Sequence, residues 1–265
     1  MRIRWQWLAA SLLILNGCDA PETDMTATQA RVDWPRLSEK KVVFAHQSVG
    51  ANILSGVESL AKRDDVNLLI EEQRAAPEGA GIAHFSVGRN GDPLGKIQDF
   101  SATMDAGAAD GTEIALLKLC YIDFNANTDA GMVANAYINT LDALSEKHPS
   151  TIFVAVTAPL ATVQTGPKAW IKKLMGKQPA QYIENRKRSE FNQIIRAHFS
   201  TTNHLFDLAR IESGTDGKRT VFQINEQEIE ALDPALTDDG GHLNARGERL
   251  AAAAFLNLIA SLPAL

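Results

Sequence analysis

The chain has 265 residues, of which 45% are hydrophobic and 22% are charged. These proportions are typical of a folded globular protein, exclude a disordered or fibrous chain, and allow one α/β domain with a sizeable core. The formal net charge of −6 argues against nucleic acid as a general partner, because a phosphate backbone attracts basic surfaces.

The first 17 residues have the pattern of an export signal. Arg2 and Arg4 precede a short apolar stretch, whereas a stable transmembrane helix needs roughly 20 apolar residues. The stretch ends in Leu-Asn-Gly-Cys18 and resembles a bacterial lipoprotein signal, which implies that Cys18 is lipidated and becomes the mature N-terminus. An ordinary secretory signal with an incidental cysteine is the alternative. Asp19 resembles the inner-membrane retention signal of enterobacterial lipoproteins.

Residues 18–39 are polar and lack hydrophobic periodicity, so we interpret them as the lipidated cysteine and a flexible tether to a single domain at 40–265. The only other cysteine, Cys120, lies in an apolar stretch. We therefore expect no disulfide, and we expect Cys120 to be a small core residue.

From residue 40 onward, short apolar segments alternate with amphipathic ones. We expect strands at 41–46, 66–71, 114–121, 151–157 and 204–208, and helices at 48–62, 94–104, 128–147, 181–199 and 245–261. This alternation predicts an α/β fold with a mostly parallel five-stranded sheet between two helical layers. In such folds, ligands bind at the carboxyl ends of the strands.

Three segments do not fit this alternation. We interpret 73–93 as a long glycine-rich loop and 210–236 as an irregular connection that could hold one hairpin. The third segment, 160–180, is an insertion that could cap a site, touch an anionic membrane surface or attract an acidic glycan, unless its apolar side packs on the domain. Its basic and apolar residues are Lys168, Trp170, Ile171, Lys172, Lys173, Leu174, Met175 and Lys177.

Two short motifs at opposite ends of the domain carry candidate catalytic side chains. Ser48 follows the first strand, where its hydroxyl would be exposed beside the positive N-terminus of a helix. Asp239 precedes His242 by three residues, a spacing that suits a base and the acid that orients it. A serine hydroxyl becomes a good nucleophile when such a base takes its proton. As alternatives, Ser48 caps its helix, His242 lies in a surface turn that Asn244 caps, or Asp238 is the acid.

The order of serine, acid and histidine in a parallel α/β chain resembles the SGNH (GDSL-like) hydrolase family over about residues 40–262. His46-Gln47-Ser48 stands in place of the family's G-D-S block, and Asp239-Gly-Gly-His242 matches its D-x-x-H block. The resemblance implies a three-layer, flavodoxin-like α/β/α fold and ester cleavage through an acyl-enzyme on Ser48. The unusual first block indicates a divergent subgroup.

The resemblance also implies an oxyanion hole. The family's second block supplies a glycine amide, and the similar setting of Asn90-Gly91 implies the amides of Gly91 and Ser48 as two donors. The third block, normally G-x-N-D, here reads Cys-Tyr-Ile-Asp at 120–123, so its glycine and asparagine are missing. The candidates for the third donor are Asn90, Tyr121 and Asn125.

The sequence supports a catalytic or ligand-binding role less strongly for other polar residues. His46 could form a hydrogen bond within the site, but a structural role is commoner, and His84 could line a pocket or be a solvated loop residue. A metal site of Asp92, Asp123 and His242 lacks the usual histidine or cysteine motifs. We expect no cofactor and no metal.

The sequence therefore predicts an esterase that faces the periplasm, is anchored by an N-terminal lipid, and acts on a small-molecule or glycan ester such as an O-acetyl group. An O-acyltransferase that uses the same site is one alternative. A non-catalytic envelope binding module that keeps the fold is another. The oligomeric state stays open.

Overall fold

The structure is a computed structural model that describes residues 31–215 and 217–263. The export signal, Cys18 and Asp19 lie outside the described residues. Among the helices within them, none has the length and apolar character that a bilayer span requires.

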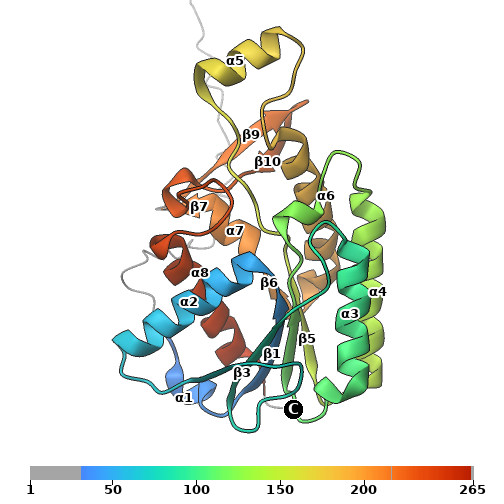
Figure 1. The fold of residues 1–265 in the computed structure, drawn as a ribbon, viewed down its shortest axis with the longest axis vertical. Coiled ribbons are helices and arrows are strands. Elements are labelled where there is room, and N and C mark those ends of the chain that lie inside the picture. Colours follow the sequence, from blue (N-terminus) through green and yellow to red (C-terminus); the bar gives the residue numbers. More distant parts are fainter. Residues whose placement is uncertain (1–30, 216, 264–265) are drawn as a thin grey trace, which may run out of the picture.

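A parallel sheet forms the centre of the domain (Figure 1). Its strand order is β2-β3-β1-β4-β5-β6, and every neighbouring pair is parallel. The predicted parallel α/β fold is confirmed, but the sheet has six strands and not five. The strands are β1 (Lys41–His46), β2 (Leu69–Glu72), β3 (Gly81–Ser86), β4 (Ile114–Leu117), β5 (Ile152–Val156) and β6 (Leu205–Phe206).

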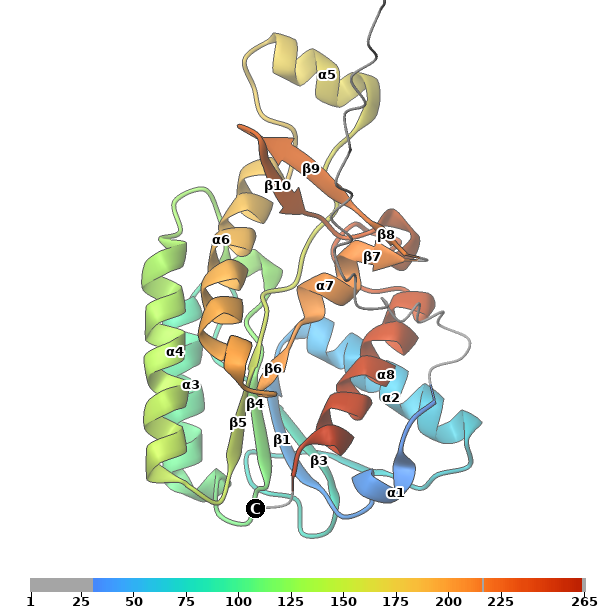
Figure 2. The same cartoon turned by 180° about the vertical axis from the view of Figure 1, so that it is seen from behind.

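Helices cover both faces of this sheet (Figures 1 and 2). One apolar core lies between the sheet and α2 (Ser48–Arg63) and α8 (Ala245–Ser261). The second core lies under α3 (Pro93–Thr103), α4 (Ala130–Lys147) and α6 (Tyr182–His198). The three-layer arrangement predicted from the sequence is therefore confirmed, since each helix buries one apolar stripe against a sheet that is buried on both faces.

The strand that the sequence did not predict, β3, lies inside the glycine-rich segment 73–93. It starts with Gly81, and the polar residues His84 and Ser86 interrupt its short apolar pattern. A Cβ atom at position 81 would lie 2.6 Å from the carbonyl oxygen of Leu69, so the close approach of β2 requires glycine there. Pairing with strands on both sides stabilises β3 in spite of its weak local propensity.

Smaller elements surround the sheet, mainly beyond the carboxyl ends of its strands. Residues 34–37, placed in the tether by their sequence, form a helical turn whose Leu37 is buried in the core. The hairpin expected within 210–236 is confirmed as β9–β10, and a second one, β7–β8, precedes it. These elements are α1 (Trp34–Leu37), η1 (Met104–Ala108), η2 (Tyr121–Asp123), α5 (Gly166–Leu174), η3 (Phe199–Thr201), α7 (Leu208–Ser213), β7 (Gly214–Thr215), β8 (Lys218–Arg219), β9 (Val221–Ile224), β10 (Gln227–Glu230) and η4 (Pro234–Leu236).

Helices α2 and α8 pack closely against each other, and this contact positions the site. A Cβ atom at Gly56 of α2 would overlap the backbone carbonyl of Glu248 in α8. The Glu248 carboxylate also accepts hydrogen bonds from Asn52 at 2.9 Å and Ser55 at 3.0 Å. The first turn of α8 therefore lies beside the second and third turns of α2, although almost 200 residues separate them in the chain.

Candidate active site

Ser48 is the first residue of α2, directly after a tight turn from β1. The Nε2 group of Gln47 donates a 2.8 Å hydrogen bond to the carbonyl of Val87, which ties this turn to the loop after β3. Gly50 lies so close to His46 that an added Cβ would overlap the imidazole ring, so the helix can begin at once only because residue 50 is glycine. Ser48 itself is half-buried.

His46 is a buried structural residue. Its Nδ1 lies 3.0 Å from the carbonyl oxygen of Gln47, and its Nε2 lies 3.2 Å from Nδ1 of His84. Burial lowers the pKa of His46 from 6.5 to about 4, so the ring is neutral at pH 7. A neutral ring donates from one nitrogen and accepts at the other, which fits these two contacts. The interaction with His84 ties β1 to β3, the neighbouring strand.

Asp239 and His242 are in direct contact. The Oδ2 atom of Asp239 lies 2.6 Å from Nδ1 of His242, and Oδ1 accepts the backbone N–H groups of Gly241 at 2.9 Å and His242 at 2.8 Å. The backbone hydrogen bond from His242 and then its side chain hold the pKa of Asp239 well below its usual range. The carboxylate that contacts the imidazole is that of Asp239 and not that of Asp238. Among residues 31–215 and 217–263, none forms a hydrogen bond with Nε2 of this ring.

Two glycines allow this turn to fold against the rest of the site. Gly240 has a φ of +89°, which favours glycine, and a Cβ there would lie 2.6 Å from Oγ1 of Thr162. A Cβ at Gly241 would lie 2.9 Å from the ring of Tyr121. That ring makes an edge-on contact with His242, with 5.7 Å between ring centroids. The Asp-Gly-Gly-His sequence thus fits between Thr162 and Tyr121.

Ser48 and His242 lie at the same rim of the sheet. Asn52, one turn after Ser48 in α2, accepts a 3.3 Å hydrogen bond from the backbone N–H of Leu243. The Ser48 hydroxyl is not hydrogen-bonded to His242; its recorded polar neighbour is Sγ of Cys120, at 4.0 Å. Cys120 itself is 1% exposed, as the sequence predicts for a core residue. The acid and the base are therefore in contact, whereas the serine hydroxyl is turned toward the cysteine.

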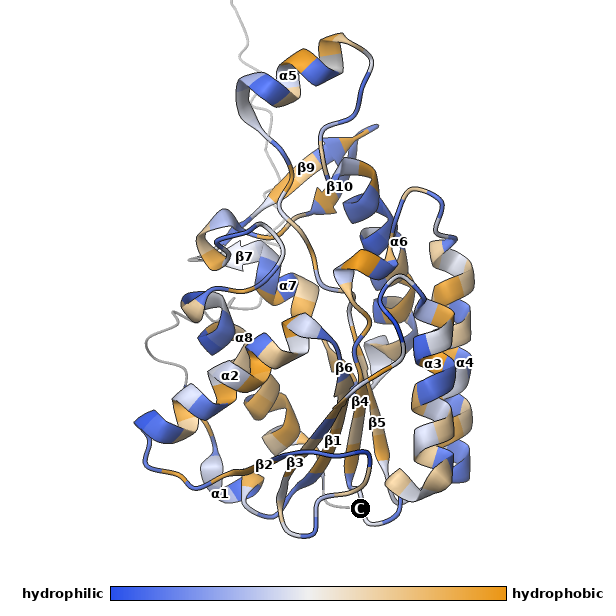
Figure 3. Ribbon diagram, viewed as in Figure 1, coloured by the Kyte–Doolittle hydropathy of each residue, from blue (hydrophilic) through white to orange (hydrophobic). Residues whose placement is uncertain are grey.

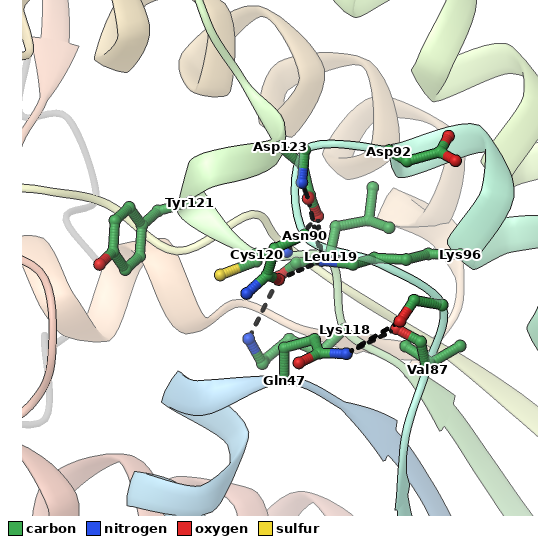
Figure 4. A network of polar contacts seen from close by, with 12 residues as sticks. Gln47, Val87, Asn90, Asp92, Lys96, Lys118, Leu119, Cys120, Tyr121 and Asp123 are labelled. Carbon is green, nitrogen blue, oxygen red and sulfur yellow. Dashed lines mark hydrogen bonds and ion pairs between the residues drawn. The ribbon is translucent and has the colours of Figure 1, made fainter.

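A buried ion pair lies beneath the loops around this rim (Figure 4). Lys96 and Asp123 are both fully buried, and their closest N–O distance is 2.8 Å. The Asp123 carboxylate also accepts the backbone N–H groups of Gly91 at 2.8 Å and Cys120 at 2.7 Å. Lys96 donates a further 2.8 Å hydrogen bond to Oδ1 of Asn90. One charge pair thus connects the loop after β3 with the loop after β4.

This network corrects the role that the sequence indicated for Gly91. Its N–H group is bonded to Asp123 and is not available to an oxyanion. The amide oxygen of Asn90 is bound to Lys96, so the Asn90 NH₂ group points to the other side, and Figure 4 places this side chain beside Cys120. Asn125, a second candidate donor, uses its side-chain oxygen in a local turn with the N–H of Asn127.

A pocket of about 380 Å³ lies next to the Asp239 turn. Its walls come from that turn, from Tyr121, and from the two ends of the 160–180 insertion. The lining is Tyr121, Ala161, Thr162, Gln164, Ala180, Gln181, Asp239, Gly240 and Gly241. Hydroxyl and amide groups contribute much of this surface, so the pocket suits a ligand that carries hydroxyl groups.

Sequence reasoning did not identify the residues that support this rim. Arg188 of α6 is buried, donates to the backbone carbonyl of Tyr121 at 3.0 Å, and donates to Oε1 of Gln181 at 2.9 Å. The sequence pattern places Lys96 within a helix and offers Asp123 only as a metal ligand. A charged residue within an apolar helical stripe is the signal that was available for Lys96, but its partner, 27 residues away, cannot be found from spacing.

No family model and no curated protein matches the sequence. The chain is similar to the solved structure of a Streptococcus pneumonia protein assigned as a platelet activating factor, with 13% identity, a TM-score of 0.50, and coverage of 83% of this chain and 84% of that one. The likeness is one of fold.

Two further structures are similar at lower scores. One is a Desulfitobacterium hafniense DCB-2 protein assigned to the lipolytic G-D-S-L family, with 11% identity, a TM-score of 0.47, and coverage of 82% of this chain and 98% of that one. The other is the periplasmic domain of a lipopolysaccharide acetyltransferase from Salmonella ser. Paratyphi A, with 14% identity, a TM-score of 0.43, and 81% coverage of each chain.

Proposed function

We propose that this protein is a serine-dependent ester hydrolase of the SGNH type. The observation that carries the proposal is the 2.6 Å contact between Asp239 and His242, on a turn that is hydrogen-bonded to the helix beginning with Ser48. In this proposal Ser48 is the nucleophile, His242 is the general base, and Asp239 holds the imidazole in the tautomer that leaves Nε2 unprotonated.

The reaction begins when the Ser48 hydroxyl turns from Cys120 toward Nε2 of His242. As Oγ attacks the ester carbonyl, His242 takes the hydroxyl proton and Asp239 stabilises the imidazolium. The tetrahedral intermediate expels the alcohol, which receives the proton from His242, and Ser48 keeps the acyl group. Water then attacks in the same way and releases the acid. Catalytic hydrogen bonds are often long without ligand and shorten in the reactive complex.

The developing oxyanion needs donors that are already in place. The N–H of Ser48 is one, because the first residues of a helix have no intrahelical acceptor for their N–H groups. The Asn90 side chain is the second. Lys96 holds its oxygen, so the NH₂ group is directed toward the side of Cys120, whose sulfur is 4.0 Å from Oγ of Ser48. Asn90 thus replaces both the Gly91 amide and the missing asparagine of the third block.

The substrate that this site suits is an ester on a hydroxyl-rich molecule, such as an O-acetyl group on an envelope glycan. The pocket of about 380 Å³ has room for a sugar-sized group beside the Asp239 turn, and its threonine, glutamine and tyrosine side chains can bond to hydroxyls. The export signal predicted from residues 1–17 favours a substrate outside the cytoplasm.

The test of this proposal is acetate release from an acetylated glycan and from a simple aryl acetate. We expect Ser48→Ala to abolish both reactions, whereas Ser59→Ala, at an exposed serine of α2, keeps them. If product analysis in the presence of a sugar acceptor shows the acetyl group on that acceptor, the activity is that of an O-acyltransferase on the same acyl-enzyme. If folded protein cleaves neither ester nor transfers the group, the binding-module alternative replaces the proposal.

For localisation, we propose a lipid on Cys18 that holds the domain at the membrane facing the periplasm, with Asp19 favouring the inner membrane. Diacyl or triacyl modification would anchor the chain stably. We expect the full chain to stay with membranes in a high-salt wash and Cys18→Ala to be released by it. Membrane retention of Cys18→Ala in high salt would contradict the lipid.

A further inference from the structure

Helix α5 (Gly166–Leu174) stands at the tip of the molecule, beyond the carboxyl edge of the sheet (Figures 1 and 2). Figure 3 shows apolar residues on it, with no other labelled element beyond it. We propose that α5 and the residue after it form a docking surface for an anionic lipid bilayer. This proposal is independent of the esterase and of the lipid on Cys18.

The apolar residues of α5 face away from the protein. At roughly 100° per residue they fall within one arc of the helix. Ala169 lies on the opposite side and is 7% exposed, so that side is the covered one. The sequence allowed the alternative that the apolar side packs on the domain, and these exposures contradict it. The outward residues are Trp170 (63% exposed), Ile171 (50%), Leu174 (68%) and Met175 (64%).

The charge of this segment is opposite to that of the whole chain. Residues 148–183 contain no Asp or Glu and four lysines, although the formal net charge of the chain is −6. Lys168 and Lys177 are exposed, and Lys172 is half-buried. Lys168 and Lys172 fall outside the apolar arc, where their stems can extend to headgroups while the apolar side chains enter the bilayer. Each lysine near an anionic membrane surface contributes favourably to the free energy of binding.

An anionic bilayer fits these observations better than other occupants do. A second copy of α5 would bring two sets of lysines together, which is unfavourable. An acidic glycan would use the lysines but leave the four apolar side chains in water. A protruding helix without a groove offers a folded partner little shape complementarity. A basic amphipathic helix, in contrast, is suited to lie in the plane of a membrane interface.

Docking of α5 would also orient the site. The pocket beside Asp239 is lined by Thr162 and Gln164 before α5 and by Ala180 and Gln181 after it. The same chain segments therefore connect the proposed membrane surface with the pocket wall. A bilayer at α5 would place the pocket close to the headgroup region, within reach of a substrate held at the membrane surface.

A fluorescent reporter tests the proposal on the full chain. An environment-sensitive nitrobenzoxadiazole group is attached to Met175→Cys in a Cys18→Ala background, and peptide mass confirms that Cys120, which is 1% exposed, carries no label. The matched control carries the group at Ser150→Cys, an exposed position before β5 at the opposite edge of the sheet. Each protein is mixed with vesicles of phosphatidylcholine alone or with added phosphatidylglycerol.

We expect a blue shift and a several-fold rise in emission at position 175 with phosphatidylglycerol vesicles, none at position 150, and reversal by salt. Trp170→Ser combined with Leu174→Ser should remove the response, while Ile122→Ser with Met132→Ser, exposed apolar residues outside α5, should keep it. No response at 175, or an equal response at 150, overturns the proposal. So does a response to a soluble acidic glycan alone, or one that depends on protein concentration without vesicles.

Discussion

The side-chain oxygen of Asn52 accepts a hydrogen bond from the backbone N–H of Leu243 at 3.3 Å. Asn52 lies one helical turn after Ser48, and Leu243 directly follows His242, so this bond joins the two halves of the candidate site. The other end of the Asn52 side chain donates to Glu248 in α8. The relative position of serine and histidine is thus set by packing between two helices from opposite ends of the domain.

The first prediction concerns the acid of the site. Asp239→Asn should lower kcat by roughly 10²–10⁴-fold, because an amide no longer stabilises the imidazolium or selects its tautomer. Asp238→Asn removes the adjacent, exposed carboxylate and should leave kcat unchanged. Steady-state hydrolysis of an aryl acetate measures both. Equal losses in the two variants would contradict the assignment of Asp239.

The second prediction separates donation by Asn90 from its support of the loop. Asn90→Asp keeps an oxygen for Lys96 but loses the NH₂ donor, so kcat should fall about 10²–10³-fold with little change in KM. Asn125→Asp keeps the oxygen of its local turn and should behave as the wild type. If Asn90→Asp retains full kcat, Asn90 does not bind the oxyanion and Tyr121 becomes the candidate.

The third prediction addresses the buried ion pair. Lys96→Met leaves the Asp123 carboxylate buried without its cation, so the free energy of unfolding should fall by about 3–5 kcal/mol. Lys62→Met, at an exposed position of α2, should change it by less than about 0.5 kcal/mol. Urea unfolding measures both variants. A loss at Lys96 as small as that at Lys62 would contradict the stabilising role of the buried ion pair.

The fourth prediction is a pH dependence of stability. Burial lowers the pKa of His46 from 6.5 to about 4, so between these values the unfolded chain binds more protons than the folded one. Stability from this residue is therefore complete above pH 6.5 and is lost as the pH falls toward 4, by about 3 kcal/mol in total. His46→Gln should lack this component in urea unfolding across that window, whereas His198→Gln, at a more exposed histidine, should keep it.

Periodicity predicted the elements that are long or strongly apolar. The strand at 41–46 and the last helix at 245–261 have the predicted bounds, and the helix at 48–62 ends one residue later. The strand β3 was not predicted, because its pairing with β2 across a loop and with β1, which lies much earlier in the chain, is not visible in its own local pattern. The local sequence pattern indicates which side chains of a segment are buried, but not which strands pair with that segment.

The candidate site shows the same difference between contacts within one turn, which the sequence predicts, and contacts between separate loops, which it does not. The contact of Asp239 with His242 follows from a spacing of three residues in a tight turn, so the sequence predicted it. The bond between Gly91 and Asp123, and the support from Lys96, arise only when two loops meet above the sheet. Sequence comparison by motif gave Gly91 a role that this contact removes.

The most direct test of the account is the identity of the residue that takes a covalent adduct. Ser48 and Cys120 lie within 4.0 Å of each other, so a labelled protein must be mapped by peptide mass. A fluorophosphonate probe on the folded full chain should modify Ser48, and Ser48→Ala should abolish the adduct while Ser59→Ala keeps it. No adduct on folded protein, or an adduct that persists in Ser48→Ala, would contradict the central claim.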